Sequence, residues 1–521
     1  MPIKVKLTNR TTTLYPPFPT ELIDKLTSFS IPNVYFMPGY NKFHTVRKMV
    51  DGKWRLVQER IWDGRKHLFD KKNNVLPTGL WLSIQDALRD EGHFYLPQDC
   101  SDARRHPSAW YREAKRSYPE LKLLLQQRFP IARHYQIDAA IAMIREAVTG
   151  GLILQATGSG KTLLAGMVFA LLWDVECLFV VDELTLLHQA RKELKDIAGE
   201  EIGFVGEGEY KIHRITVATI QTLDLHKHDP KFMQWLEGVN ILVLDEIHVQ
   251  MAMRNFSVIE ALRPAAVFGL TATLEMKKKH IRLRAQALCG PVLYEYPYAQ
   301  GVKEEFLAKG AVVRVIVEKQ AAIHKGMLWY QYDYHKHIGN SKRRNTIVEL
   351  LARESLMADR RVIVLVERVA HLQRITKRLA NCNPATVWGG KKSKERIRTQ
   401  SKFEKGELRL IIANKVFEKG VNIKSVDTGI DASASKSPNK AMQKFGRFVR
   451  LCKGKKYALF FDISDKGNRF EEAANIRFRT FKKNKIPVVT VRAPDDLTDR
   501  AGFRLWFNKI VLDVERVLKV E

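Results

Sequence analysis

A short glycine-rich run carries the most specific chemical signal in this 521-residue sequence. Residues 156–162 read Ala-Thr-Gly-Ser-Gly-Lys-Thr, between the apolar run 152–154 and the helical pattern 163–172. Glycines let backbone N–H groups surround phosphate oxygens, the lysine reaches the β- and γ-phosphates, and the following hydroxyl can hold Mg²⁺. The first position, usually glycine, is Gln155, and an ordinary glycine-rich turn is the alternative. We predict a phosphate loop formed by Thr157, Gly158, Ser159, Gly160, Lys161 and Thr162.

An acidic pair offers the matching chemistry. Asp245 and Glu246 directly follow the apolar run 241–244. The carboxyl end of a buried strand is where an α/β sheet presents groups to a ligand. We expect Asp245 to bind Mg²⁺ together with Thr162, and Glu246 to orient and deprotonate the water that attacks the γ-phosphate. The alternative for the acidic pair alone is a helix N-cap.

Two arginines near residue 450 could complete such a site. Arg447 and Arg450 have the i, i+3 spacing that places side chains on one face of a helix, and Gln443 precedes them. Arginines so placed can neutralise the charge that develops on a γ-phosphate during transfer. Taken alone, the pair is also typical of a solvated helix face.

The elements that must position these groups follow from hydrophobic periodicity. From about residue 120, apolar runs alternate with helical patterns, which predicts βαβ units around parallel sheets. The first series of predicted strands is 152–154, 177–181, 215–218, 241–244 and 267–270. A second series comprises a helix at 346–352 and strands at 362–366, 410–413 and 458–461. Two α/β lobes in tandem fit both the periodicity and the length.

The first hundred residues have a different pattern. Short aromatic and β-branched runs at 34–37 and 54–57 alternate with turn pairs at 51–52, 63–64 and 73–74, and a helical pattern covers 82–89. Such a pattern predicts a small, β-rich α+β domain. We therefore expect an N-terminal domain, a first lobe, a second lobe and a terminal helix, with boundaries 1–115, 116–325, 326–495 and 496–521.

The net charge indicates a polyanionic partner. The sequence has 87 Lys and Arg against 57 Asp and Glu, a formal charge of +30. Such an excess favours nucleic acid first and an acidic membrane surface second. No signature of a zinc finger, homeodomain or RNA-recognition motif is present, so we expect backbone and shape recognition. The basic runs are 277–279, 342–344, 391–394, 453–456 and 482–485.

The cysteines and the hydropathy of the sequence indicate the cellular compartment of the protein. Five scattered cysteines include no pair at zinc spacing, which argues against a structural metal and favours a reducing compartment. No apolar stretch approaches the roughly 18 residues that a membrane helix needs, and residues 1–10 do not lead into the apolar core of a signal peptide. We expect a cytoplasmic monomer with no membrane attachment.

In their order along the chain, these motifs resemble those of superfamily 2 helicases. The phosphate loop is similar to motif I and residues 245–248 to motif II of the DExH type. The other matches are 133–136 (Q motif), 182–189 (motif Ia, without its usual Pro-Thr-Arg core), 218–223 (motif Ib), 270–273 (motif III), 413–422 (motif V) and 443–450 (motif VI). The resemblance implies two RecA-like lobes, parallel sheets flanked by helices, that use ATP and Mg²⁺.

The resemblance also implies roles for individual residues. Arg133, Gln136 and Gly420 would contact the nucleotide. Motif V departs from the family pattern, because Lys415 and Asn422 stand where threonine and aspartate are usual. The implied catalytic set is Lys161, Asp245, Glu246, Gln443, Arg447 and Arg450. The implied DNA contacts are Gln189, Thr219, Gln221, Gly389, Gly390 and Lys415, whereas we expect the neighbouring Trp388 to pack in the core.

The N-terminal stretch narrows the family. Residues 61–69 and 76–80 are similar to the small N-terminal domain of phage UvsW-type recombination helicases; a generic Trp-Asp-Gly hairpin is the alternative. The resemblance implies that the N-terminal domain, 1–115, engages DNA. The implied activity is branch migration, fork regression or unwinding of forks and Holliday junctions in recombination, repair or replication. It also implies a phage protein in the host cytoplasm, with replication or recombination proteins as partners. An RNA helicase and a non-catalytic nucleic-acid scaffold remain alternatives.

Overall fold

The computed structural model resolves the chain into two compact units. One unit comprises Met1–Leu154, Thr162–Asp182 and Ala190–Glu295, and the other comprises Gln155–Lys161, Glu183–Gln189 and Tyr296–Glu521. The residues that the structure describes are 2–8, 10–31, 43–50, 53–60, 62–95, 108–146, 150–156, 158–251, 258–259, 262, 264–272, 278–318, 326–390, 393–414 and 423–520.

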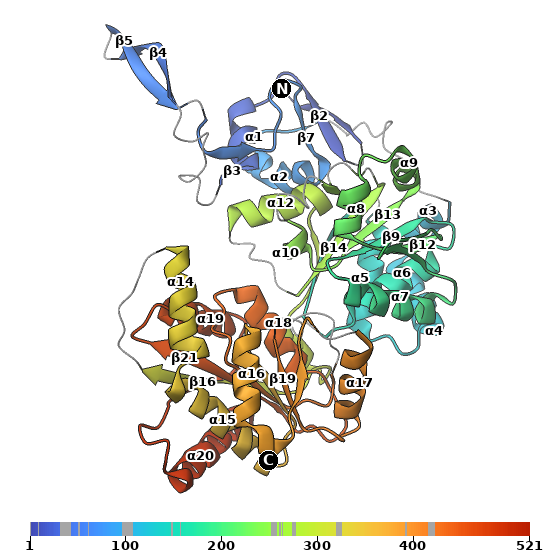
Figure 1. Ribbon diagram of the computed structural model, residues 1–521. Helices are drawn as coiled ribbons and strands as arrows, with labels where there is room; N and C mark the ends of the chain where they lie inside the picture. Colours follow the sequence, from blue (N-terminus) through green and yellow to red (C-terminus); the bar gives the residue numbers. More distant parts are fainter. Residues whose placement is uncertain are drawn as a thin grey trace. The chain divides into compact units, whose positions relative to one another are not determined.

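The N-terminal part of the first unit is α+β, as predicted (Figure 1). Its antiparallel strands pair as β1–β2–β7, β3–β6 and β4–β5. The predicted strand 54–57 lies in β5 and the predicted helix 82–89 lies in α2, whereas 34–37 and 51–52 lie outside the described residues. The bounds are β1 Lys4–Leu7, β2 Thr11–Tyr15, α1 Thr20–Thr27, β3 Ser28–Ser30, β4 Phe43–Val50, β5 Lys53–Arg60, β6 Arg65–His67, β7 Val75–Pro77 and α2 Thr78–Asp90.

The Trp-Asp-Gly turn is stabilised by its own side chains. The indole N–H of Trp62 donates to the Arg65 carbonyl at 2.9 Å, and the Arg65 N–H donates to Asp63 Oδ1 at 2.9 Å. Gly64 has a φ of 77°, which favours glycine. His67 lies 2.7 Å from Asp24 and 3.0 Å from Asp63 through its two ring nitrogens. The Trp-Asp-Gly sequence is therefore accounted for by side-chain contacts that stabilise a turn.

A single hydrophobic core joins the N-terminal elements to the first large sheet. Leu80 and Trp81 on α2 belong to the same buried cluster as Leu152 and Leu288. Helix α2 crosses α12 (Lys279–Cys289) closely, since a Cβ on Gly79 would lie 2.2 Å from the Gln286 carbonyl oxygen. Figure 1 shows the two helices side by side. The boundary at residue 115 stays a prediction.

The first large sheet has eight strands in the order β11-β10-β12-β9-β13-β14-β8-β15. Adjacent strands from β10 to β8 pair in parallel, and β11 pairs with β10 antiparallel. Its strands are β8 Gly150–Gln155, β9 Cys177–Val181, β10 Gly203–Gly206, β11 Glu209–Lys211, β12 Ile215–Thr219, β13 Ile241–Leu244, β14 Ala266–Thr271 and β15 Val292–Tyr296. All five strands predicted for this lobe are confirmed.

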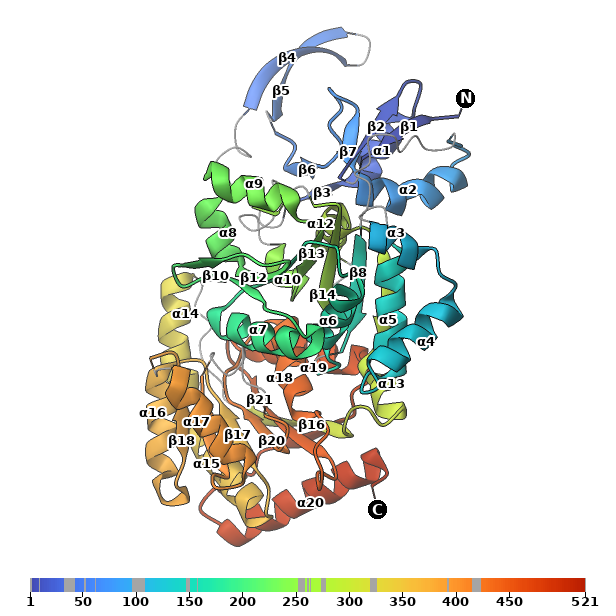
Figure 2. The same cartoon turned by 90° about the vertical axis from the view of Figure 1, so that its right-hand side faces the viewer.

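Helices flank this sheet, and Figure 2 shows α5, α6 and α7 beside it. The central strands β9, β12 and β13 are buried at every position, as continuous apolar runs in a covered parallel sheet must be. The helices from here to the second sheet are α3 Ser108–Ala114, α4 Tyr118–Arg128, α5 His134–Arg145, α6 Lys161–Leu171, α7 Leu184–Ala198, α8 Ile220–His226, α9 Pro230–Gly238, α10 Ile247–Gln250, α12 Lys279–Cys289 and α13 Tyr298–Lys303.

The second sheet has seven strands in the order β18-β19-β17-β20-β21-β16-β22, paired in parallel. It takes in β16, which precedes residue 326, where we placed the start of this lobe; the partners of β16 come later in the chain. The bounds are β16 Gly310–Glu318, β17 Val362–Leu365, β18 Ala385–Val387, β19 Leu410–Ala413, β20 Thr428–Asp431, β21 Ala458–Lys466 and β22 Val488–Arg492.

The helices of the second unit include α20 in the segment where we expected a terminal helix. Phe503, Phe507 and Ile510 on α20 are buried in the core of the second sheet, whereas Leu512 is exposed. The bounds are α14 Met327–Asp333, the π-helix η2 Tyr334–Gly339, α15 Lys342–Met357, α16 Val369–Arg378, the 3₁₀-helix η3 Ala380–Cys382, α17 Ser393–Glu404, α18 Pro438–Phe448, α19 Glu471–Lys483 and α20 Arg500–Leu518.

Two further findings concern the described residues. None of their helices is both long and apolar enough to span a membrane. The cysteines among them are unpaired thiols: Cys177, Cys289, Cys382 and Cys452.

Candidate functional site

Three neighbouring strands of the first sheet end in the residues predicted to do chemistry. Strand β14 lies between β13 and β8, with Leu244 opposite Gly269 and Leu154 opposite Thr271. The phosphate loop follows β8, and the acidic pair follows β13. Parallel pairing therefore places both motifs at the same carboxyl edge, where α/β sheets bind ligands.

The phosphate loop has the backbone geometry that its glycines permit. Gly158 and Gly160 have φ values of 87° and 84°, which L side chains rarely adopt. The Ser159 N–H donates to the Ala156 carbonyl at 3.1 Å and tightens the turn. Lys161 is the first residue of α6, and Thr162 follows on that helix. Helix α6 can therefore direct its N-terminal N–H groups at a phosphate; Thr157 lies outside the described residues.

Gln155, the departure from the usual motif, is part of the structure of the loop. Its side chain is fully buried, and its Oε1 accepts a hydrogen bond from the Ser159 hydroxyl at 3.4 Å. Its Nε2 has no hydrogen-bond partner among the described residues. A glutamine here therefore fastens the base of the loop to Ser159, a contact that glycine could not make.

The acidic pair sits on a constrained turn. Glu246 adopts a left-handed conformation with φ 47° and ψ 56°, and its N–H donates to Asp245 Oδ1 at 3.0 Å. The Asp245 N–H donates to the Val180 carbonyl on the neighbouring strand β9 at 2.9 Å. A left-handed non-glycine residue is strained, and such strain is typical of functional sites. The turn keeps both carboxylates part-exposed at the sheet edge.

Two further residues hold the Glu246 carboxylate. The Thr271 hydroxyl, at the end of β14, donates to Glu246 Oε2 at 3.4 Å, and His248 Nδ1 lies 3.3 Å from the same oxygen. His248 Nδ1 also lies 3.1 Å from the Thr271 hydroxyl. Neither residue was among our predicted site residues, although both lie in segments with motif resemblance. Their pairing follows from the β13–β14 register, which the sequence does not show.

The predicted metal site has a suitable donor set. Thr162 and Asp245 are both partly exposed and offer hard oxygen atoms. Mg²⁺ typically takes one or two protein oxygens and completes its shell with water and phosphate. No group of three or more His, Cys, Asp and Glu side chains at metal-binding distance occurs among the described residues. This composition fits an ion that arrives with a nucleotide.

Arg133 and Gln136 form a helix cap. The Arg133 N–H donates to Gln136 Oε1 at 2.9 Å at the start of α5, and Gln136 is buried. The Arg133 guanidinium donates to the Tyr135 hydroxyl at 3.3 Å. These contacts define the conformation of the segment, and its role in reading adenine stays a prediction.

The predicted nucleic-acid contacts fall into two kinds. Thr219 is buried and caps α8, accepting from the Thr222 N–H, whereas Gln221 is exposed and donates to the Asp182 carbonyl at 3.0 Å. Gln189 is half-buried. These geometries make Gln221 a better placed candidate than Thr219, whose hydroxyl serves the helix. The roles of all three stay predictions.

Gly389 and Gly390 are exposed beside a packed tryptophan. A Cβ on Gly390 would lie 2.1 Å from the Trp388 ring, so a larger residue at this position would require that ring to shift. Trp388 packs against the core of the second sheet, as we expected. The motif V residues Lys415, Gly420 and Asn422 lie outside the described residues.

The motif VI residues lie on and after α18. Gln443 and Arg447 are on the helix, but α18 ends at Phe448, so Arg450 follows the helix instead of sharing its face. The unit that holds α18 also takes in Gln155–Lys161. Within that unit, a Cβ on Gly158 would lie 3.1 Å from Arg450 Cγ. Arg450 is therefore close to the phosphate loop.

Lys455 holds the end of this helix. Its Nζ donates to the carbonyls of Phe448 and Arg450 at 2.9 and 2.7 Å. Burial lowers the pKa of Lys455 to about 8. This ammonium group fixes the backbone that leads from Arg447 to Arg450.

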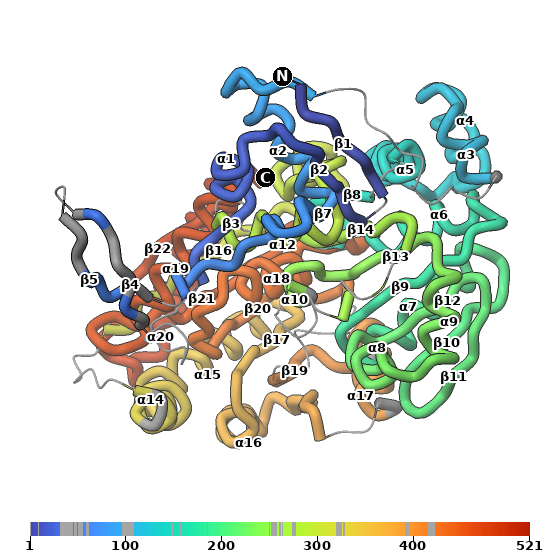
Figure 3. The backbone as a smooth tube through the Cα atoms, turned by 90° about the horizontal axis from the view of Figure 1, so that it is seen from above, coloured from blue at the N-terminus to red at the C-terminus, as the bar shows by residue number. Residues whose placement is uncertain are grey.

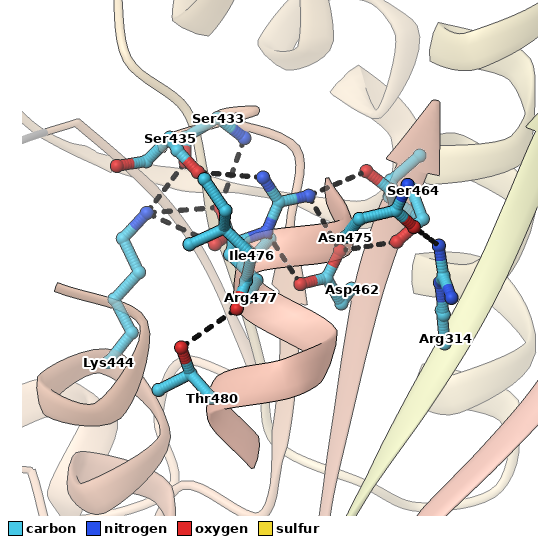
Figure 4. A network of polar contacts seen from close by, with 12 residues as sticks. Arg314, Ser433, Ser435, Lys444, Asp462, Ser464, Asn475, Ile476, Arg477 and Thr480 are labelled. Atoms are coloured by element: carbon cyan, nitrogen blue, oxygen red, sulfur yellow. Dashed lines mark hydrogen bonds and ion pairs between the residues drawn. The ribbon is translucent and has the colours of Figure 1, made fainter. Parts of the chain in front are cut away.

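A buried ionic network fixes the other side of α18 (Figure 4). Lys444 Nζ donates to both oxygens of Asp431 at 3.1 Å and to the Ser433 hydroxyl at 2.6 Å. Burial alone would raise the pKa of Asp431, but the Lys444 and Arg477 charges hold it below its usual value. Lys444 immediately follows Gln443, so this pair sets the position of the motif VI helix.

Arg477 on α19 completes the network. It binds Asp462 through two hydrogen bonds of 2.7 and 2.8 Å and donates to the Ser435 carbonyl at 2.7 Å. Figure 4 shows the Lys444 and Arg477 side chains converging on the segment that carries Ser433 and Ser435. That segment leads into α18, so two buried cations fix the backbone just before the helix begins.

Two known families match the chain over the regions that hold these motifs. Residues 130–276 match the family described as type III restriction enzyme, res subunit (ResIII). Residues 342–452 match the family described as helicase conserved C-terminal domain (Helicase_C). The matches cover β8 to β14 of the first sheet and β17 to β20 of the second, and they include the phosphate loop, the acidic pair and the motif VI arginines.

The chain is also similar, at low sequence identity, to individual proteins. The DNA 3'-5' translocase XPB2 of Sulfurisphaera tokodaii is 24% identical over 411 residues, which cover 68% of this chain and 89% of that protein. Other curated relatives are matched over about half of their own length. Saccharomyces cerevisiae Dbp5, solved with RNA and ADP BeF3, shares the fold at a TM-score of 0.53 and 17% identity, over 78% of this chain and 99% of that chain. T4 UvsW aligns at a TM-score of 0.44 and 16% identity, over 95% of this chain and 99% of that chain.

Proposed function

The chain belongs to the superfamily 2 helicases, ATP-hydrolysing enzymes, and we propose that it is a DNA helicase or translocase that remodels branched DNA. The observation that carries the ATP chemistry is the carboxyl edge of the first sheet. There the register of β13, β14 and β8 brings Glu246, Thr271 and the phosphate loop to neighbouring strand ends.

The residues at this edge have different roles in ATP hydrolysis. Lys161 and the N–H groups of the loop bind the phosphates, and Glu246 takes the proton of the attacking water. Thr271 and His248 hold the Glu246 carboxylate in place, and Arg450 can balance charge on the phosphates. Thr162 and Asp245 would hold Mg²⁺, which would neutralise charge on the phosphate oxygens when bound.

DNA is the proposed substrate class for two reasons. The curated relatives include a DNA 3'-5' translocase and a DNA 3'-5' helicase, both DNA enzymes by name. The formal charge of +30 also suits a polymer of phosphates, because phosphate contacts supply most affinity that is independent of sequence. Dbp5 shares the fold, but its RNA is a property of that protein.

Branched DNA is proposed from the N-terminal resemblance to UvsW-type helicases. The expected activities are branch migration, fork regression and unwinding, in recombination, repair or replication. Within this proposal the N-terminal elements hold duplex while the two lobes advance on one strand. The Trp62–Arg65 turn supports those elements structurally.

The test compares substrates under one set of conditions. Purified protein with Mg-ATP is given a replication fork, a Holliday junction, a plain duplex and a structured RNA, and strand products are separated on gels. We expect product from the fork and the junction, and none with Glu246→Gln. Remodelling of RNA alone would replace DNA by RNA in the proposal. Binding without ATP hydrolysis on any substrate would leave a scaffold, and activity on plain duplex only would remove the preference for branches.

A further inference from the structure

The short helix α14 displays aromatic side chains on its outer face. Trp329, Tyr330 and Tyr332 are 49%, 40% and 49% exposed, within four consecutive positions. Figure 3 shows α14 at the rim of the second unit, and no residue assigned above to ATP lies on it. Soluble proteins rarely expose several large rings together unless the surface binds something.

Cations accompany these rings. Lys336 Nζ lies 5.5 Å from the centre of the Tyr332 ring, and Arg469 Cζ lies 5.2 Å from that of Tyr330. The only acid in the segment 326–344 is Asp333, whose side chain is buried. The exposed surface of this segment is therefore aromatic and positive, without a competing carboxylate of its own.

The opposite face anchors the helix firmly. Tyr334 and Ile338 are buried in a cluster with Ala434 and Phe470. The Tyr334 hydroxyl donates to the Ser433 carbonyl at 3.2 Å. Ser433 is the residue whose hydroxyl accepts from Lys444, so the anchor of α14 reaches the segment that leads into the motif VI helix.

The backbone after α14 is also unusual. Residues Tyr334–Gly339 form a π-helix, and the Asn340 N–H donates to the His335 carbonyl at 2.8 Å, a bond spanning five residues. π-Helical turns are rare and are frequent at functional sites. In this π-helix Tyr334 and Ile338 are buried, while His335 and Lys336 are exposed.

We propose that Trp329, Tyr330, Tyr332 and Lys336 form a stacking platform for unpaired bases of single-stranded nucleic acid. Aromatic rings stack on bases of any sequence, and adjacent cations attract the phosphates that connect them. An apolar protein partner would gain nothing from the cations over the rings. The platform deepens the proposed function and rests on it, because strand separation is what supplies unpaired bases.

The experiment uses the full chain and two labelled probes, a single-stranded oligothymidylate and a blunt duplex, with affinity measured by fluorescence anisotropy at fixed salt. The variant Trp329→Ala/Tyr332→Ala should lose roughly tenfold or more in affinity for the single strand, from loss of stacking, and change little for the duplex. The matched controls are Trp329→Phe/Tyr332→Phe, which keeps two rings, and Trp173→Ala, which removes another exposed tryptophan. Both should bind like the wild type.

The outcomes separate this platform from the proposed function. ATP hydrolysis without nucleic acid, and the melting temperature, should be unchanged in all variants, and the single variant Trp329→Ala provides a second test if the double variant melts early. Unchanged single-strand affinity in a wild type that still remodels forks would overturn the platform alone. Equal losses for single strand and duplex would also overturn it. A wild type that binds no single strand would overturn both proposals.

Discussion

The carboxyl edges of the two sheets place charged residues at similar positions but give them opposite surroundings. At the first edge, Asp245 and Glu246 are part-exposed on a strained turn. In the second sheet, Asp431 lies directly opposite Asp462, and both are 2% exposed. Two carboxylates at directly paired positions of neighbouring strands repel each other, so this buried pair requires the cations Lys444 and Arg477.

The difference shows how one architecture separates chemistry from positioning. Carboxylates that stay partly solvated can exchange partners with a nucleotide and water. Carboxylates that are buried and saturated with hydrogen bonds cannot take part in a reaction, but they fix the elements that carry the reacting groups. Substitutions at the first edge should therefore lower the rate of ATP hydrolysis without unfolding the chain. Substitutions in the buried network of the second sheet should lower the free energy of unfolding.

The largest expected effect tests the first edge. Glu246→Gln removes the base that accepts the proton of water, and we expect ATP hydrolysis to fall roughly 10³-fold, about 4 kcal/mol in activation free energy. The free energy of unfolding should stay within about 0.5 kcal/mol, because the group is part-exposed. Phosphate release and urea unfolding provide the measurements. The control is Glu237→Gln, which changes another exposed carboxylate. A variant that keeps a tenth of the wild-type rate would exclude Glu246 as the base.

The next effect tests the second sheet. Lys444→Met leaves Asp431 buried without its cation, and we expect about 3 kcal/mol less free energy of unfolding, measured in urea. Adding Asp431→Asn should restore most of the loss. The matched control is Lys436→Met, which breaks the exposed ion pair with Glu472 and should cost less than about 0.5 kcal/mol. Equal losses for Lys444→Met and Lys436→Met would remove the distinction between buried and exposed charges.

A smaller effect concerns how Glu246 is held. Thr271→Val keeps the shape of a fully buried side chain but removes the hydroxyl that donates to Glu246. We expect kcat to fall about tenfold, equivalent to 1.4 kcal/mol, with the KM for ATP little changed. Thr216→Val on β12 is the control, since its hydroxyl donates to the His213 carbonyl away from the site. If both variants keep the wild-type kcat, the Thr271 hydroxyl does not position Glu246.

The smallest effect is a pH dependence near the end of α18. The pKa of Lys455 is about 8 in the folded chain, below its value of 10.5 in the unfolded chain. Between pH 8 and 10 the unfolded chain therefore binds the proton that the folded chain releases, so the Lys455 contribution to stability rises with pH. Relative to Lys455→Met, the wild type should gain about 1 kcal/mol from pH 8 to 9. A constant difference in unfolding free energy would show that burial does not lower this pKa.

The strands of both sheets could be predicted where apolar runs are uninterrupted. β9, β13 and β19 were predicted to the residue, because continuous burial leaves no polar position inside them. β20, with the sequence Thr-Gly-Ile-Asp, was missed because it contains a single large apolar residue. Its burial comes from neighbouring strands that lie far away in sequence.

The site could be predicted in part for a related reason. The phosphate loop and the acidic pair are local patterns, so the residue types alone indicate their chemistry. The contacts of Thr271 and His248 with Glu246 depend on strand register, and the burial of Lys444 depends on helix packing. In a sequence with a formal charge of +30, a buried lysine reads like any solvated one.

The crossing of α2 over α12 has a consequence for how the chain can be divided. Leu80, Trp81 and Leu288 share one core, and Arg10 donates to the Leu288 carbonyl at 2.6 Å. A truncated chain that starts after residue 95 would expose the apolar surface of α12 to water, and we expect such a chain to aggregate. The N-terminal elements and the first sheet should instead protect each other's amides from hydrogen exchange and open together, as one cooperative folding unit.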